Sequence, residues 1–210
     1  MMNIKNEIKE AFSENKKIFL ILIILFAIGF VIGAILANDI APILMPILKE
    51  AMIEENATSI DAFNIMSHNL NSAITIIFAS VFFAIFAVIS IISNGFVIGF
   101  MAGYTVKSVN TLILYLVLIL PHGIIELPAL FCSCASGILL FLFIFRTIKD
   151  KIDHYSFYDA FDNNRNTLKH MLILMIIAIV LFVIAALIEG FITPELGNIA
   201  NQLMGGEKLF

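Results

Sequence analysis

Long apolar runs separated by short polar segments dominate the residue pattern. The first run, IFLILIILFAIGFVIGAILA, covers residues 18–37 and follows Lys16 and Lys17. It has the roughly 20 apolar residues that carry an α-helix across the hydrocarbon core of a bilayer. Another run of similar length covers residues 171–192 near the end of the chain. The pattern therefore predicts an all-α integral membrane protein.

Two further apolar runs, residues 72–104 and 111–145, are longer than one ordinary spanning helix. A helix of about 33 residues extends roughly 50 Å, well beyond the roughly 30 Å core of a bilayer. The first of these runs must therefore protrude, tilt or break. Asn94-Gly95 is its natural break, because this dipeptide favours turns. The second run either crosses twice or is re-entrant.

The distribution of Lys and Arg favours two crossings for residues 111–145, because cytoplasmic loops collect these residues. With two crossings, ten of the twelve fall on one side, namely Lys5, Lys9, Lys16, Lys17, Lys107, Arg146, Lys149, Lys151, Arg165 and Lys169. With a single crossing, the twelve divide equally between the two sides. We therefore expect about five transmembrane helices in the cell membrane, a cytoplasmic N-terminus and an extracytoplasmic C-terminus.

The reversal within this run falls at LPHGIIELPA, residues 120–129. Pro121 and Pro128 each remove a backbone N–H from a helix, and Gly123 adds backbone freedom. Backbone groups left unpaired at membrane depth are tolerated only inside the protein or beside a water-filled cavity. The motif PHGxxELP therefore predicts a broken or re-entrant hairpin that the other helices enclose.

Amphipathic segments flank the spans within a single membrane domain, residues 1–210. Residues 1–17 place apolar side chains at helical spacing among Lys and Glu, which predicts a cytoplasmic amphipathic helix at the membrane surface. The polar, acidic segment of residues 38–71 predicts an extracytoplasmic helical cap. Residues 146–170 combine mixed charges with aromatic side chains. This cytoplasmic amphipathic segment is either a helix on the membrane or a docking surface for a partner.

Small residues recur at intervals of four in three of the apolar runs. At this interval they form a smooth stripe that lets membrane helices approach closely. The positions are Gly29 and Gly33 in the first run, Gly95, Gly99 and Gly103 in the second, and Ser133 and Gly137 in the third. The stripes predict a tightly packed bundle, and any stripe not needed within the bundle favours a homodimer.

A small set of polar side chains lies within the predicted spans. His122 and Glu126 are four residues apart and share a face of any local helix. Glu189 is the other carboxylate in a span, and Asn94 is the most conspicuous amide. Three interpretations stay open: a structural cluster that stabilises the bend, a proton or cation site in a transport path, and a metal site for catalysis within the membrane. The metal ligands would be His122, Glu126 and Glu189.

Composition supports the membrane assignment and excludes several functions. The chain has 210 residues, of which 61% are hydrophobic and 13% charged, and its mean hydropathy is +1.04. The net charge of −4 and the lack of a basic cluster exclude nucleic-acid binding. Cys132 and Cys134 point to different faces of a helix, so neither a disulfide nor a zinc knuckle is expected. The sequence contains no HExxH, GxSxG or phosphate-binding loop, and we expect neither an enzyme nor a cofactor.

Three segments together resemble the stage II sporulation protein M family of multi-spanning membrane proteins. They are LPHGIIELPAL at residues 120–130, Asn94-Gly95 with the glycine spacing that follows it, and ALIEGFITPEL at residues 186–196. The family's characteristic positions correspond here to Asn94, Gly95, Pro121, His122, Gly123, Glu126, Pro128, Glu189 and Pro194. The resemblance extends from the first span to the last.

The resemblance implies a function that the residues alone do not. In spore-forming bacteria the family member is a membrane component of the engulfment machinery, a scaffold that localises peptidoglycan-degrading partners and has no established catalytic activity. We therefore predict a non-enzymatic membrane scaffold or assembly factor that binds the lipid bilayer and membrane or cell-envelope proteins. The alternative is a small transporter or channel subunit that uses Glu126, His122 and Glu189 for protons or cations.

Overall fold

The computed structural model describes residues 4–57, 62–81, 84–153, 155–193, 195–196 and 199, which contain α-helices and no β-strand. The helices are α1 (Ile4–Glu14), α2 (Lys16–Ala57), α3 (Ala62–Ala79), α4 (Ile85–Thr105), α5 (Val109–Ile152) and α6 (Phe157–Phe191). Among the described residues, the segments long and apolar enough to cross a membrane are Lys16–Ile47, Ile85–Thr105, Gly123–Ile152 and Phe157–Phe191. The prediction of an all-α membrane protein is confirmed, and these four segments are close to the expected count of about five.

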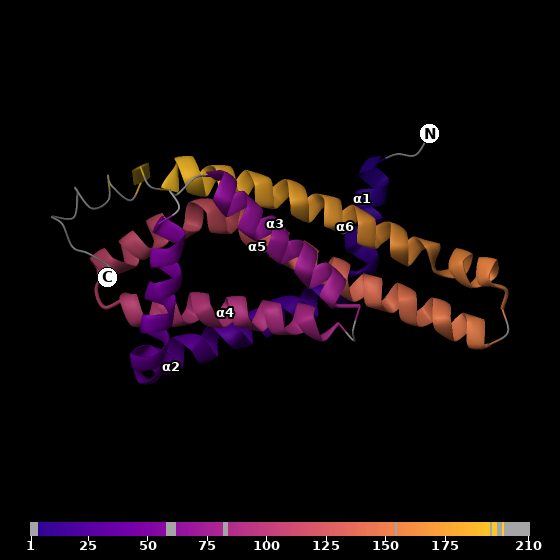
Figure 1. The fold of residues 1–210 in the computed structure, drawn as a ribbon, viewed down its shortest axis with the longest axis horizontal. Helices are drawn as coiled ribbons and strands as arrows, with labels where there is room; N and C mark the ends of the chain where they lie inside the picture. The colour runs from indigo at the N-terminus through magenta and orange to yellow at the C-terminus, as the bar shows by residue number, and fades with distance from the viewer. Residues whose placement is uncertain are drawn as a thin grey trace.

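The helices form an elongated bundle in which α2 pairs with α4 and α5 pairs with α6 (Figure 1). Between the pairs, α3 packs on α5 and α6 and diverges from α4. We call one end of the bundle the α1 end, because it holds α1 and the turn between α5 and α6. The opposite end, which holds the turn between α4 and α5, is called the far end.

The apolar run 72–104 breaks at a different place from the one that the sequence indicated. It forms parts of α3 and α4, and Ala84 in the turn between them adopts the left-handed conformation, with φ of 55°. Asn94 and Gly95 lie inside α4, where the Asn94 amide donates a hydrogen bond of 2.9 Å to the carbonyl oxygen one turn earlier. The expected break at Asn94-Gly95 is therefore wrong, because Gly95 takes part in a helix contact and not in a turn.

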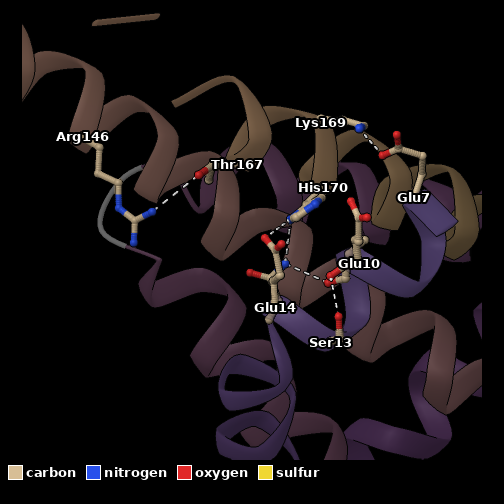
Figure 2. A network of polar contacts seen from close by, with 10 residues as sticks. Glu7, Glu10, Ser13, Glu14, Arg146, Thr167, Lys169 and His170 are labelled. Atoms are coloured by element: carbon tan, nitrogen blue, oxygen red, sulfur yellow. Dashed lines mark hydrogen bonds and ion pairs between the residues drawn. The ribbon is translucent and has the colours of Figure 1, made fainter. Parts of the chain in front are cut away.

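Residues 111–145 run along the bundle once, as part of α5. Lys107 Nζ donates to Asn38 Oδ1 at 3.1 Å, so the turn before α5 lies beside the far end of the first span. At the other end of the run, Arg146 Nη1 donates to Thr167 Oγ1 at 3.5 Å, close to α1 (Figure 2). The expected double crossing is therefore wrong.

The chain nevertheless runs along the bundle five times, as α2, α3, α4, α5 and α6 (Figure 1). The additional passage comes from α3, which the sequence assigned in part to the polar cap. Nine of the twelve Lys and Arg residues lie in helix segments at the α1 end: Lys5, Lys9, Lys16, Lys17, Arg146, Lys149, Lys151, Arg165 and Lys169. Lys107, expected on their side, lies at the far end.

α5 bends at the PHGxxELP motif, and this bend takes the place of the expected hairpin. The first part of α5 runs obliquely at the far end before the remainder crosses the bundle (Figure 1). Pro121 and Pro128 lie inside the helix. Each lacks the N–H that would bond one turn back, which weakens the helix on one side and lets it bend.

The two parts of α5 advance in the same direction along α4. Tyr115, in the first part, donates its hydroxyl to the Ile98 carbonyl oxygen at 2.8 Å. Cys134, in the second part, lies in hydrogen-bonding contact with Ser90, which is earlier in α4. A chain that reversed at the motif would return toward Ile98, so α5 is a bent helix antiparallel to α4.

α2 and α4 lie so close together that the glycine stripe of each helix contacts the backbone of the other. A Cβ atom added at either glycine of the α2 stripe would collide with the α4 backbone, and the reverse holds for the three glycines of α4. The affected positions are Gly29, Gly33, Gly95, Gly99 and Gly103. Two of the stripes therefore face each other within one chain.

The third stripe lies where α5 contacts α3 and α6. Ser133 Oγ donates to the Ala73 carbonyl oxygen of α3 at 3.2 Å, and both residues are fully buried. A Cβ atom added at Gly137 would lie 3.2 Å from the Ile76 carbonyl oxygen of α3 and 2.8 Å from Oγ of Ser80, the residue after α3, so α3 also approaches α5 closely at this position. Side-chain hydroxyls thus bond across helices that small residues allow to approach.

The expected cap at residues 38–71 is divided between two helices. α2 continues past Asn38 to Ala57, with Pro42 and Pro46 inside it, and its last part turns across the far end (Figure 1). Residues 58–61 lie outside the described residues. The remainder, from Ala62 onward, belongs to α3 and so to the bundle.

The amphipathic helix expected at the N-terminus corresponds to α1, which crosses α6 at the α1 end (Figure 1). Lys169 of α6 forms an ion pair with Glu7 of α1 (Figure 2). Two turns further on, Glu14 at the end of α1 lies 3.7 Å from Nδ1 of the buried His170, and Nδ2 of Asn15, the next residue, lies 3.2 Å from the same nitrogen. These contacts hold α1 across the bundle.

Reversing the charge of Glu7 should loosen α1. In Glu7→Lys, two cations face each other where an ion pair stood, and we expect a cost of about 1 kcal/mol to α1 docking. Hydrogen exchange of the α1 amides should then become severalfold faster. The double variant Glu7→Lys with Lys169→Glu should restore slow exchange, whereas Glu10→Lys, at an exposed position, should leave it unchanged. If Glu7→Lys and Glu10→Lys changed the exchange of the α1 amides equally, the ion pair between Glu7 and Lys169 would not be what holds α1.

Candidate functional site

A cavity of about 740 Å³ with a mixed polar and apolar lining lies between α3, α4 and α5 and also contacts α6. Its size falls within the range of small-molecule sites in proteins. Polar side chains supply much of the lining, and they are His68, Asn69, Asn71, Ser72, Thr75, Ser90, Asn94 and Glu126. Such a concentration of polar groups is unusual inside a bundle of membrane helices, where they are rare and associated with function.

α3 contributes one polar face to the cavity. His68, Asn71 and Thr75 recur at the three- and four-residue spacing that places side chains on one side of a helix. Away from this polar face, Ile77 is buried, whereas Phe78 is exposed. α3 is thus an amphipathic helix within the bundle, and its polar side lines the cavity.

α4 faces the cavity with the side opposite its glycine stripe. Ser90, Asn94 and Met101 line the cavity, whereas Gly95 and Gly99 contact α2. The close approach of α2 therefore determines which face of α4 is left for the cavity.

The bend in α5 brings the PHGxxELP motif to the cavity. Gly123 and Glu126 line it, together with Leu127 and Leu130 further along the helix. A Cβ atom added at Gly123 would meet only Ile119 Cγ2, at an ordinary 3.5 Å, so this glycine leaves open space beside the helix. Among the described lining residues, Glu126 is the single Asp, Glu, Lys or Arg.

The structure brings together some of the residues selected from the sequence. Asn94, Gly123 and Glu126 share the cavity. Glu189 of α6 is not among the residues that line it. The backbone of His122 lies in α5, but its side chain is outside the described part of the structure, as is Pro194.

The proposed metal ligands are not assembled in the part of the chain that the structure describes. Within that part, no group of three or more His, Cys, Asp or Glu side chains is arranged to hold a metal ion. Of the three ligands considered, Glu126 and Glu189 are described, and the side chain of His122 is not.

The sequence patterns did not predict that α3 contributes to the cavity. Residues 62–71 were assigned to a polar cap, although HNLNSAIT at 68–75 already has polar side chains on one helical face and small or apolar ones on the other. That amphipathic pattern was the signal for a helix that packs in the bundle and lines a polar space.

Comparison with known proteins identifies the family. The sequence profile described as stage II sporulation protein M matches residues 22–194, which include nearly all of α2 to α6. The chain belongs to the stage II sporulation protein M family. The matched range contains Asn94, Gly123 and Glu126, and therefore the motif that lines the cavity.

Two archaeal relatives are similar to this member of the family. "Uncharacterized protein MJ0793" of Methanocaldococcus jannaschii is 32% identical over 135 residues, which cover 64% of this chain and 72% of the relative. "Uncharacterized protein MJ0706" of the same organism is 34% identical over 88 residues, which cover 40% of this chain and 37% of the relative. No solved structure matches the chain.

The groups in the cavity of this family member define what it can bind. Amide side chains both donate and accept hydrogen bonds, and the hydroxyls of Ser72, Thr75 and Ser90 do the same. An ionised Glu126 accepts hydrogen bonds and attracts positive charge. The lining therefore suits a polar ligand, neutral or cationic, and disfavours an anion.

Proposed function

We propose that this protein is a non-enzymatic membrane scaffold that holds a partner protein at its α1 end. The observation that supports the proposal is a hairpin, formed by residues 146–153 at the end of α5 and residues 155–168 at the start of α6, whose tip extends the bundle beyond α1 (Figure 1). It carries exposed aromatic side chains at its tip and charged residues along both arms. A protruding element of this kind is suited to binding another protein.

The exposed aromatics are unusual for a solvated turn. Tyr155, Phe157 and Tyr158 are 50%, 69% and 77% exposed, and Ile152 beside them is 70% exposed. An apolar cluster rimmed by polar residues is typical of a protein interaction site, and aromatic residues are enriched in such sites. The charges around it, including Asp150 and Lys151, disfavour burial of the hairpin in the hydrocarbon core.

Contacts between the two arms of the hairpin stabilise this surface. Asn164 Nδ2 donates to Asp150 Oδ2 at 2.9 Å and so joins the two arms. Phe143 of α5, just before the hairpin, and Phe161 of α6 pack edge to face, with ring centroids 5.6 Å apart. At the tip, Ser156 caps α6 by accepting the Asp159 amide at 3.1 Å. The aromatic side chains are therefore presented on a fixed scaffold, which lowers the entropy cost of binding.

In-membrane photocrosslinking tests the proposal. A photoreactive aromatic residue at Tyr158 should give an adduct with one partner protein of discrete mass. The same residue at Phe78, which is 61% exposed on α3 within the bundle, is the matched control and should give no such adduct.

The adduct must also depend on the hairpin surface. Replacing Tyr155 and Phe157 with serine should abolish the Tyr158 adduct and release the partner from the membrane fraction, while the protein itself stays folded. If the partner remains in the membrane fraction at an unchanged level, the hairpin is not what holds it.

The second candidate function, a transporter or channel subunit, is supported by the polar cavity with its carboxylate. The variant Glu126→Gln distinguishes the candidates. A scaffold that uses the hairpin keeps its partner in this variant, because Glu126 lies in the cavity and not in the hairpin. A transporter stays folded in this variant and loses flux.

A further inference from the structure

We propose that the cavity between α3, α4 and α5 binds a small organic cation, such as a protonated amine or a quaternary ammonium compound. This site goes beyond the scaffold function and does not depend on it, because the cavity and the hairpin share no residue. Three properties of the lining carry the inference: its charge, its size and its mixture of polar and apolar groups.

Charge selects the sign of the ligand. Glu126 is the single Asp, Glu, Lys or Arg among the described lining residues, and its carboxylate is negative when ionised. A charge within the membrane is costly unless a group of opposite sign is near it. A cation beside Glu126 would have such a partner, whereas an anion would meet a carboxylate of its own sign.

Size distinguishes an organic cation from a bare metal ion. The cavity volume of about 740 Å³ far exceeds what a bare monovalent ion occupies. A metal site places several oxygen ligands within roughly 2.0–2.6 Å of one point. The polar groups here are instead distributed over α3, α4 and α5, as they would be around an extended ligand.

The remaining lining matches the apolar part of such a ligand. Phe182 of α6 contributes an aromatic ring, and Met101 and Leu130 contribute flexible apolar side chains. Aromatic faces attract quaternary and primary ammonium groups, and more strongly when both are desolvated. Amides such as those of Asn71 and Asn94 can accept the N–H groups of a protonated amine.

Thermal unfolding of the full chain in detergent tests the proposal with defined probes. Choline, putrescine and sodium, each as the chloride, are compared with dimethylbutanol, the uncharged isostere of choline. We expect at least one of the organic cations to raise Tm by about 5 °C at a concentration about a hundredfold above its Kd. Dimethylbutanol and sodium should leave Tm unchanged.

Variants locate the effect in the cavity. Glu126→Gln should abolish the rise in Tm, and Glu189→Gln, which removes a carboxylate outside the lining, should retain it. If Glu126→Gln fails to fold, Thr75→Phe fills the cavity and leaves the carboxylate in place, and it should abolish the rise too.

Four results would each contradict binding of an organic cation in the cavity. Equal stabilisation by dimethylbutanol, stabilisation by sodium alone, an effect that survives both cavity variants, or no response to either organic cation would each overturn the proposal. None of these results would affect the hairpin, whose test is the Tyr158 adduct.

Discussion

Gly99→Ala should destabilise the protein by roughly 2–3 kcal/mol, although alanine is the better helix former. The added methyl group would collide with the Phe30 carbonyl oxygen and would lie 2.8 Å from the Phe30 Cα atom. These are backbone atoms of α2, so no side-chain rotation can relieve the contact. α2 and α4 must then move apart along their whole interface, which costs the close packing that holds membrane helices together.

Gly123→Ala is the matched control for this prediction. Gly123 also lies inside a helix, but an added Cβ atom would meet only Ile119 Cγ2, at 3.5 Å. The gain in helix propensity should therefore dominate, and the variant should be as stable as the original protein or slightly more stable. Denaturation in mild detergent, followed by circular dichroism, compares the two. A Gly99→Ala protein as stable as Gly123→Ala would show that α2 and α4 are not in backbone contact.

Single cysteines at positions 107 and 153 should react with a membrane-impermeant maleimide from opposite sides of the membrane. Lys107 is hydrogen-bonded to Asn38 at the far end, whereas Asp153 ends α5 in the hairpin at the α1 end. Because cytoplasmic segments of membrane proteins are enriched in Lys and Arg, we expect the α1 end to be the cytoplasmic one. Position 107 should therefore label in intact cells, and position 153 only after the membrane is permeabilised.

Background labelling of the two native cysteines can be removed. Cys132 and Cys134 are 2% and 0% exposed and can be replaced with alanine before the single cysteines are introduced. A cysteine at position 38 should label together with position 107. Labelling of positions 107 and 153 from the same side is the result that the double crossing of residues 111–145 requires, and it would contradict the bent α5.

The glycine stripes show what a sequence pattern can and cannot tell. Their four-residue spacing correctly indicates helices that approach closely, because small side chains on one helical face leave room for another backbone. The spacing does not say which helices meet. Contact between the stripes of α2 and α4 emerges only when both are placed in the bundle, and it assigns these stripes to the interior of one chain.

Asn94-Gly95 illustrates how local preference gives way to tertiary contact. The dipeptide favours a turn in isolation, but in the bundle Gly95 is the point where the Phe26 backbone touches α4. The Asn94 amide bonds within its own helix and its side chain lines the cavity. The sequence does not distinguish a glycine that allows helices to approach closely from a glycine that forms a turn, because both roles require the absence of a Cβ atom.

The sequence by itself determined that this is an all-α membrane protein, because hydropathy and run length are properties of the chain alone. It also located the bend of α5 and proposed a polar cluster of Asn94, His122, Glu126 and Glu189, of which Asn94 and Glu126 line the cavity. Only the tertiary structure decided that α5 does not reverse, that α3 joins the bundle and that its polar face completes the cavity with α4. These features depend on which helix faces meet, and such pairings arise from contacts between residues far apart in the chain, which no local pattern records.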